Sequence, residues 1–206
     1  IRDSIKIVAN KFARFYIFVI RGTPMMVQSL IFYYAIFNLF KRTGMSVTEI
    51  NRVWSLFISG LVTVSLNSTA YLAEVLRGGI LAVDAGQMEA ARSLGMTHWQ
   101  AMRRVVFPQA IKNSLPAIGN EFIINIKDSS VLCVLGVSDL MFMTRSVAGI
   151  YYKGTECYLI AATVYLFLTY LSSLLLKTIT GRMTAPDNTK RRQGNQTVDL
   201  GLPSSN

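Results

Sequence analysis

Residues 157–176 form a run of twenty residues without a charged side chain, and this run allows few kinds of fold. A helix needs about 20 apolar residues to cross the hydrocarbon core of a bilayer. Lys177 and Arg182 follow the run, where basic side chains reach the membrane interface. The run therefore predicts an integral membrane protein.

Three further segments are predicted to cross the membrane. Residues 54–76 contain a single charged residue, Glu74, and residues 23–40 contain none. Residues 113–137 are more polar, and their ionisable residues are Glu121, Lys127 and Asp128. A charge at the centre of a spanning helix costs at least ~2.5 kcal/mol, so this segment is expected to turn a polar face towards protein or water.

Residues 5–20 mix basic side chains with large apolar ones. Such a mixture favours an amphipathic helix lying at the membrane surface. The same mixture would suit the cytoplasmic end of a span that begins before Ile1, and the residues alone leave both interpretations open.

The basic residues divide the loops into two sets. Residues 1–21, 77–112 and 177–206 each contain five Lys or Arg, whereas residues 41–53 contain three and residues 138–156 contain two. Because basic loops remain in the cytoplasm, the first set is predicted to be cytoplasmic, with four spans and both ends inside. The excess of basic residues is thus a membrane feature, and we do not expect nucleic acid to be a partner.

The chain divides into a predicted transmembrane domain, residues 1–182, and a polar tail, residues 183–206, which is expected to be disordered. The two cysteines are too few for a disulfide framework. No pattern for a catalytic site or a metal cluster is present, so neither is predicted.

The loop at 84–108 is too polar to span the membrane and too regular to be a simple linker. Asp84 and Thr97 are each placed to cap a helix, and Gly95 can adopt the left-handed conformation that ends one. The pattern predicts two short helices, 85–94 and 98–107, with Pro108 stopping or kinking the second. Such a hairpin suits a groove on a partner protein, although a connector without a partner would have the same pattern.

The same loop resembles the EAA loop of ABC importer permeases. The matching residues are Glu89-Ala90-Ala91, Gly95 and Phe107-Pro108, with Val105 and Phe107 in place of the usual Ile and Leu. Further stretches resemble the polar amino-acid branch: Arg21-Gly22-Thr23-Pro24 with Val27-Gln28, Gly86-Gln87, Leu66-Asn67-Ser68, Ala70 to Glu74, Arg77-Gly78-Gly79, and Lys127 to Ser130 with Ser129 for Thr. The resemblance extends from about Arg14 to Tyr165.

This resemblance implies an all-α polytopic bundle of the type I ABC importer permease kind, with a first transmembrane helix missing before Ile1. It implies a multi-pass subunit of the bacterial cytoplasmic (inner) membrane that pairs with a second permease, the same or related. Two ATPase subunits would dock on the loop and bind ATP and Mg, and an extracytoplasmic amino-acid-binding protein would deliver the cargo. The implied coupling residues are Gly86, Gln87, Glu89, Ala90, Ala91, Gly95 and Pro108.

This chain contains no G-x-x-x-x-G-K-S/T motif for ATP, so no cofactor is expected in it. An amino acid carries an ammonium and a carboxylate, and polar residues within the spans are candidates to bind it. These are Asn67, Ser68, Glu121, Asn125 and Asp128. Glu121, Asn125 and Asp128 share one helix face, although Asp128 could instead pair with Lys127 or Arg77.

Other classes of protein are possible. Intramembrane Glu121 and Asp128 would also suit an ion-coupled transporter or a channel without an ATPase, but neither needs a helical hairpin at 84–108. An intramembrane enzyme would need a nucleophile with a base, or a metal, and the single histidine, His98, supplies neither. A membrane scaffold would not need the polar face of 113–137.

Overall fold

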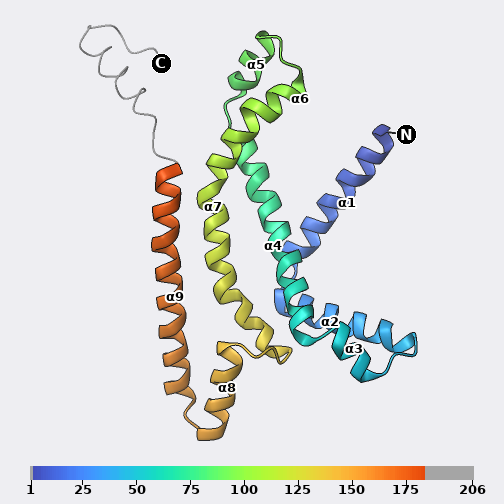
Figure 1. Ribbon diagram of the computed structural model, residues 1–206, viewed down its shortest axis with the longest axis vertical. Helices are drawn as coiled ribbons and strands as arrows, with labels where there is room; N and C mark the ends of the chain where they lie inside the picture. Colours follow the sequence, from blue (N-terminus) through green and yellow to red (C-terminus); the bar gives the residue numbers. More distant parts are fainter. Residues whose placement is uncertain (1, 184–206) are drawn as a thin grey trace, which may run out of the picture.

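The computed structural model describes residues 2–183, and the secondary structure in that range is helical throughout (Figure 1). The elements are α1 (Arg2–Gly22), α2 (Met25–Arg42), α3 (Val47–Val53), α4 (Leu56–Leu81), α5 (Ala85–Ser93), α6 (His98–Ala101), the π-helical η1 (Met102–Val106), α7 (Phe107–Asp128), the 3₁₀ helix η2 (Ser129–Val134), α8 (Leu140–Tyr151) and α9 (Gly154–Met183). The predicted all-α fold is confirmed. Apart from Met183, the tail predicted over residues 183–206 lies outside the described residues.

Within the described residues, α4 and α9 are the helices that are long and apolar enough to cross a membrane alone. They contain the predicted spans 54–76 and 157–176 almost completely. Their surroundings differ, since 28% of the apolar stretch of α4 is buried in the chain but only 6% of that of α9. The outer surface of α9 is therefore left for lipid or for another chain.

The bundle is held together where small residues let helices approach closely. Helix α7 lies between α4 and α9 and contacts both (Figure 1). Gly79 of α4 is buried, and a Cβ there would lie 2.7 Å from the carbonyl oxygen of Ala110 and overlap the side chain of Ser114. A Cβ on Gly119 of α7 would lie 2.7 Å from Cγ of Leu176 on α9. Close contacts at small residues are the usual means of helix association in membranes.

Replacing Gly79 by valine is expected to destabilise the chain by about 1–3 kcal/mol or more, because the new side chain would meet the backbone of α7. The adjacent Gly78 is the matched control, since a Cβ there has nothing within 4 Å. Thermal unfolding in detergent should show a lower midpoint for Gly79→Val and little change for Gly78→Val. Equal midpoints for the two variants would contradict the close α4–α7 contact.

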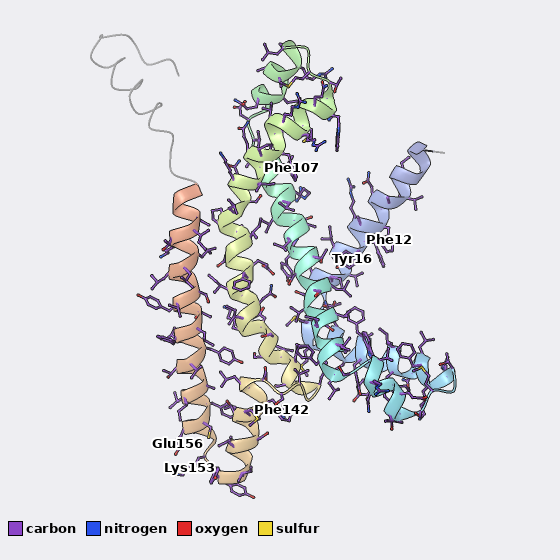
Figure 2. The ribbon with its side chains drawn as sticks, in the orientation of Figure 1. Phe12, Tyr16, Phe107, Phe142, Lys153 and Glu156 are labelled. Carbon is purple, nitrogen blue, oxygen red and sulfur yellow. The ribbon has the colours of Figure 1, made fainter. Side chains whose placement is uncertain are left out.

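The first two helices correct the predicted arrangement of spans. Helices α1 and α2 meet at a bend of 113°, and only the two together are long and apolar enough to cross a membrane. Helix α1 packs on α4, and the Tyr16 hydroxyl donates to the carbonyl of Leu66 at 2.6 Å (Figure 2). Helix α2 runs across the direction of α4, α7 and α9 (Figure 1). Residues 23–40, predicted as a separate span, are thus found as one arm of a bent pair, which is either a broken span or a re-entrant loop.

The bounds of the polar span also differ from the prediction. Helix α7 starts at Phe107 and ends at Asp128, and the chain continues as η2 to Val134, so 113–137 is not one helix. Pro116 lies inside α7 without ending it. The start was misplaced because Pro116, a residue that suits the first turn of a helix, lies inside α7 instead.

The ends of the helices form two groups (Figure 1). The start of α1, the α5–α6 hairpin and the end of α9 lie towards one end of the molecule. The α2–α3 pair and α8 lie towards the other end. The described parts of the three basic segments, residues 2–21, 77–112 and 177–183, contribute to the first group (Figure 1).

Candidate functional site

The loop between α4 and α7 is a helical hairpin that projects from one end of the molecule (Figure 1). Asp84 caps α5 by accepting from the backbone N–H of Gly86 at 2.6 Å. Gly95 reverses the chain with a φ of +84°, a conformation that glycine adopts without steric cost. Thr97 and Gln100 then form a capping box that starts α6. The predicted caps and the glycine turn are confirmed.

The hairpin leaves an apolar surface open. Ala91 is buried, whereas Glu89 and Ala90 are exposed. Leu94 is 82% exposed and Trp99 is 69% exposed. Large apolar side chains at an end that also carries charged residues are typical of a surface that another protein covers.

The hairpin continues into the bundle without a break. Pro108 was predicted to stop or kink the second helix, but α6 passes through η1 into α7, and Phe107 lies at the junction (Figure 2). The π-helical turn is closed by the N–H of Phe107, which donates to the carbonyl of Met102. The Gln109 side chain donates to that of Gln87 on α5 at 3.2 Å. A movement of the hairpin would therefore be carried directly into α7.

The bend between α1 and α2 is fixed by one buried side chain. The amide nitrogen of Gln28 lies 2.7 Å from the carbonyl of Ile20, 2.9 Å from that of Thr23 and 2.7 Å from the Thr23 hydroxyl. The Gln28 amide oxygen accepts from Asn67 of α4 at 3.1 Å. Only 4% of Gln28 and 8% of Asn67 are exposed, so this pair anchors the bend to α4. Asn67, a predicted cargo residue, is engaged within the protein here.

The other predicted cargo residues lie along the contact between α4 and α7. Asn125 of α7 donates to the hydroxyl of Ser68 on α4 at 2.9 Å. Glu121 is half-buried one turn before Asn125, and Asp128 is exposed at the end of α7. The structure thus brings polar groups from α4, α7 and the α1–α2 bend into one region.

A charged cluster lies beside this region. Arg77 donates to both carboxylate oxygens of Glu74, at 2.8–3.2 Å. Nη1 of Arg21 lies 3.7 Å from the same carboxylate, and its guanidinium lies 5.2 Å from the ring centroid of Tyr71. Among side chains 7–181, Asp128 has no ion-pair partner, so the alternative pairing with Arg77 is not seen.

A cleft of about 470 Å³ opens at the end opposite the hairpin. It lies between α2, the start of α4 and the segment after η2. Its lining includes Tyr33, Asn51, Phe57, Gly136 and Ser138. The cleft is separate from the polar region between α4 and α7.

Residues 4–185 match the family described as the binding-protein-dependent transport system inner membrane component. The match includes the hairpin, the α1–α2 bend and the polar region between α4 and α7. The chain therefore belongs to this family of membrane transport subunits.

Particular relatives agree with this assignment. The glutamine transport system permease protein GlnP of Escherichia coli (strain K12) is 34% identical over 176 residues, which are 85% of this chain and 76% of that protein. The probable amino-acid permease protein YxeN of Bacillus subtilis (strain 168) is 37% identical over 182 residues, 88% of this chain and 78% of that protein. A crystal structure of an amino acid ABC transporter with histidines is 44% identical, with a TM-score of 0.72, and the match covers 87% of this chain and 77% of that one.

Proposed function

We propose that this chain is the transmembrane subunit of an ATP-binding-cassette importer that carries a polar amino acid across the bacterial cytoplasmic membrane. The observation that carries the proposal is the hairpin of α5 and α6, which is continuous with α7. A docking element joined directly to a spanning helix can convert movement of a bound ATPase into movement of that helix. The printed names of the relatives, among them a glutamine permease, support an amino acid as the cargo.

In this mechanism the ATPases bind ATP and Mg, approach one another and displace the hairpins of two permease subunits. Helix α7 follows its hairpin, and its contacts with α4 change. Because the Ser68–Asn125 hydrogen bond joins these helices, it is a natural point for the cargo path to open and close. The result would be alternating access, in which the site faces one side of the membrane at a time.

The different surfaces of the molecule suggest where the proposed partners bind. The described parts of the basic segments lie towards the hairpin end, which supports a cytoplasmic position for that end, beside the proposed ATPases. The cleft of about 470 Å³ then faces outward, where an extracytoplasmic binding protein would deliver cargo. The apolar surface of α9 is suited to lipid or to a second permease.

The proposed cargo residues are Asn67, Ser68, Glu121, Asn125 and Asp128. Helix α7 is unbroken from Glu121 to Asp128, so these two carboxylates and Asn125 share a face. Glu121 is the strongest candidate to receive an ammonium group, because it is half-buried beside the α4–α7 contact.

Co-purification tests the proposal. The tagged chain is extracted from its native membrane in mild detergent, and its partners are identified by mass spectrometry. An ATPase subunit is expected with the parent chain and should be lost from the double variant Glu89→Ala, Gly95→Trp. Absence of any ATPase from the parent sample would contradict the importer and favour an ion-coupled transporter.

Replacing Glu121 by glutamine is expected to raise the KM for uptake of L-arginine by roughly tenfold or more, since a hydrogen bond to a charged group contributes about 1.5–3 kcal/mol. Uptake of L-glutamine should weaken as well, since it carries the same α-ammonium group. The control is Glu156→Gln, which removes an exposed carboxylate at the start of α9 (Figure 2). Uptake into vesicles that contain the complete transporter gives both values, and an unchanged KM would remove Glu121 from the site.

A further inference from the structure

Arg21 has an unusual position for an arginine in a membrane protein. It lies in the last turn of α1, where that helix meets the middle of α4 (Figure 1). Ionisable residues inside membrane bundles are rare, and they usually pair with another group or contact a ligand. The role of Arg21 therefore depends on what its guanidinium contacts.

The guanidinium of Arg21 has a nearby partner, but its N–H donors lack close acceptors. Its ion pair with Glu74 is long, at 3.7 Å, and Arg77 already donates three hydrogen bonds to that carboxylate. Among side chains 7–181, no hydrogen bond from the Arg21 guanidinium is found, and 43% of the side chain is exposed. Arginine carries five N–H donors, so an open position of this kind is suited to an anionic acceptor.

The surroundings of Arg21 match the two charged groups of an amino acid. The ring of Tyr71 lies 5.2 Å from the guanidinium and limits its orientation through a cation–π contact. Asn125 of α7 donates to Ser68 of α4 at 2.9 Å, and these two helices run antiparallel (Figure 1). Glu121 lies one turn from Asn125 and Tyr71 one turn from Ser68 in the same direction, so Glu121 lies near the level of Tyr71. A positive and a negative side chain from different helices thus flank α4 at the level of Tyr71. Planar guanidinium groups bind carboxylates with two parallel hydrogen bonds, whereas a carboxylate such as Glu121 accepts from an ammonium.

We propose that Arg21 binds the α-carboxylate of the transported amino acid while Glu121 receives its α-ammonium. This inference rests on the proposed function, because it assumes that the cargo is an amino acid. It adds a specificity residue, Arg21, that would make the site select for a free carboxylate. Glu74 would then hold Arg21 in place until cargo arrives. The cargo carboxylate would then replace Glu74 as the partner of Arg21.

Direct binding tests this assignment. The detergent-purified complex of permease and ATPase, without binding protein, is mixed with the twenty tritiated proteinogenic L-amino acids in a scintillation proximity assay. The amino acid that is retained is then competed by its unlabelled form and by its α-carboxamide. The parent complex should prefer the free acid by at least roughly tenfold, as expected for loss of a charge-assisted hydrogen bond.

In Arg21→Gln we expect binding to weaken by roughly tenfold or more and the preference for the acid over the carboxamide to disappear. Arg21→Lys should retain part of the preference, since it keeps the charge but loses the planar donor pair. Arg14→Gln is the matched control, because it removes an exposed arginine from the same helix and should behave as the parent.

Two results for Arg21→Gln would overturn the assignment. One is binding and preference unchanged from the parent. The other is an equal loss of affinity for acid and carboxamide, which would indicate only a structural role. If the parent complex retains none of the twenty amino acids, the proposed cargo itself is wrong and the assignment fails with it. Co-purification of the ATPase would show separately whether the importer architecture still holds.

Discussion

Replacing Gly95 by tryptophan is expected to reduce ATP-driven uptake by at least roughly tenfold while ATP hydrolysis continues. A non-glycine residue at a φ of +84° costs about 1–2 kcal/mol, which lowers the population of the hairpin conformation by roughly 5–30-fold. A Cβ at Gly95 has no other atom within 4 Å, so the indole would project outward into the space that the ATPase is proposed to occupy. Uptake into vesicles and ATP hydrolysis are measured on the same preparation.

A second variant separates backbone strain from bulk. Asparagine tolerates the left-handed conformation better than other non-glycine residues, so Gly95→Asn should retain most of the uptake. Uptake by Gly95→Trp that equals the parent's would contradict a coupling role for the hairpin. An equally large loss of uptake in Gly95→Asn would show that a changed backbone conformation, and not the bulk of the indole, causes the loss.

Replacing Gln28 by leucine is expected to destabilise the chain and to reduce uptake together. The change would leave the buried Asn67 amide without its acceptor and would remove the donor that holds Ile20 and Thr23 at the α1–α2 bend. A buried polar group without a partner costs about 1–3 kcal/mol. Thermal unfolding in detergent measures the loss of stability, and vesicle uptake measures its consequence for transport.

A double-mutant cycle isolates the Gln28–Asn67 interaction. Gln28→Leu and Asn67→Leu are compared singly and together, and the double variant should lose less stability than the sum of the single losses, by about 0.5–3 kcal/mol. This is expected because two apolar side chains leave no unsatisfied group across the pair. Additive losses would mean that the 3.1 Å hydrogen bond contributes nothing to anchoring the bend.

Local signals were sufficient to predict the hairpin. Asp84, Gly95 and Thr97 each act within a few residues of their own position, and the structure contains the caps and the turn as predicted. Pro108 was misjudged because a proline does not have to end a helix. Here it lies directly after a π-helical turn, where the hydrogen-bond register changes, and the helix continues.

The long-range contacts of polar residues could not be predicted from their neighbours in sequence. Gln28 and Asn67 are 39 residues apart, and Ser68 and Asn125 are 57 apart, so their hydrogen bonds depend on how α4 packs. The sequence marked Gln28 and Arg21 only as parts of a motif, without a role. One local signal for this role was available: Gln28 is a polar residue close to the break between the predicted segments 5–20 and 23–40.

The sequence by itself determined the class of this protein, its two most apolar spans and the coupling hairpin, because charge, length and capping are local properties. The tertiary structure decided that α1 and α2 form a bent pair, since the 113° bend depends on the buried Gln28 contacts with α1 and α4. It also decided which polar residues meet: Arg21 of α1 lies over Tyr71 of α4, and Asn125 of α7 donates to Ser68 of α4, contacts that only the packing of the three helices creates.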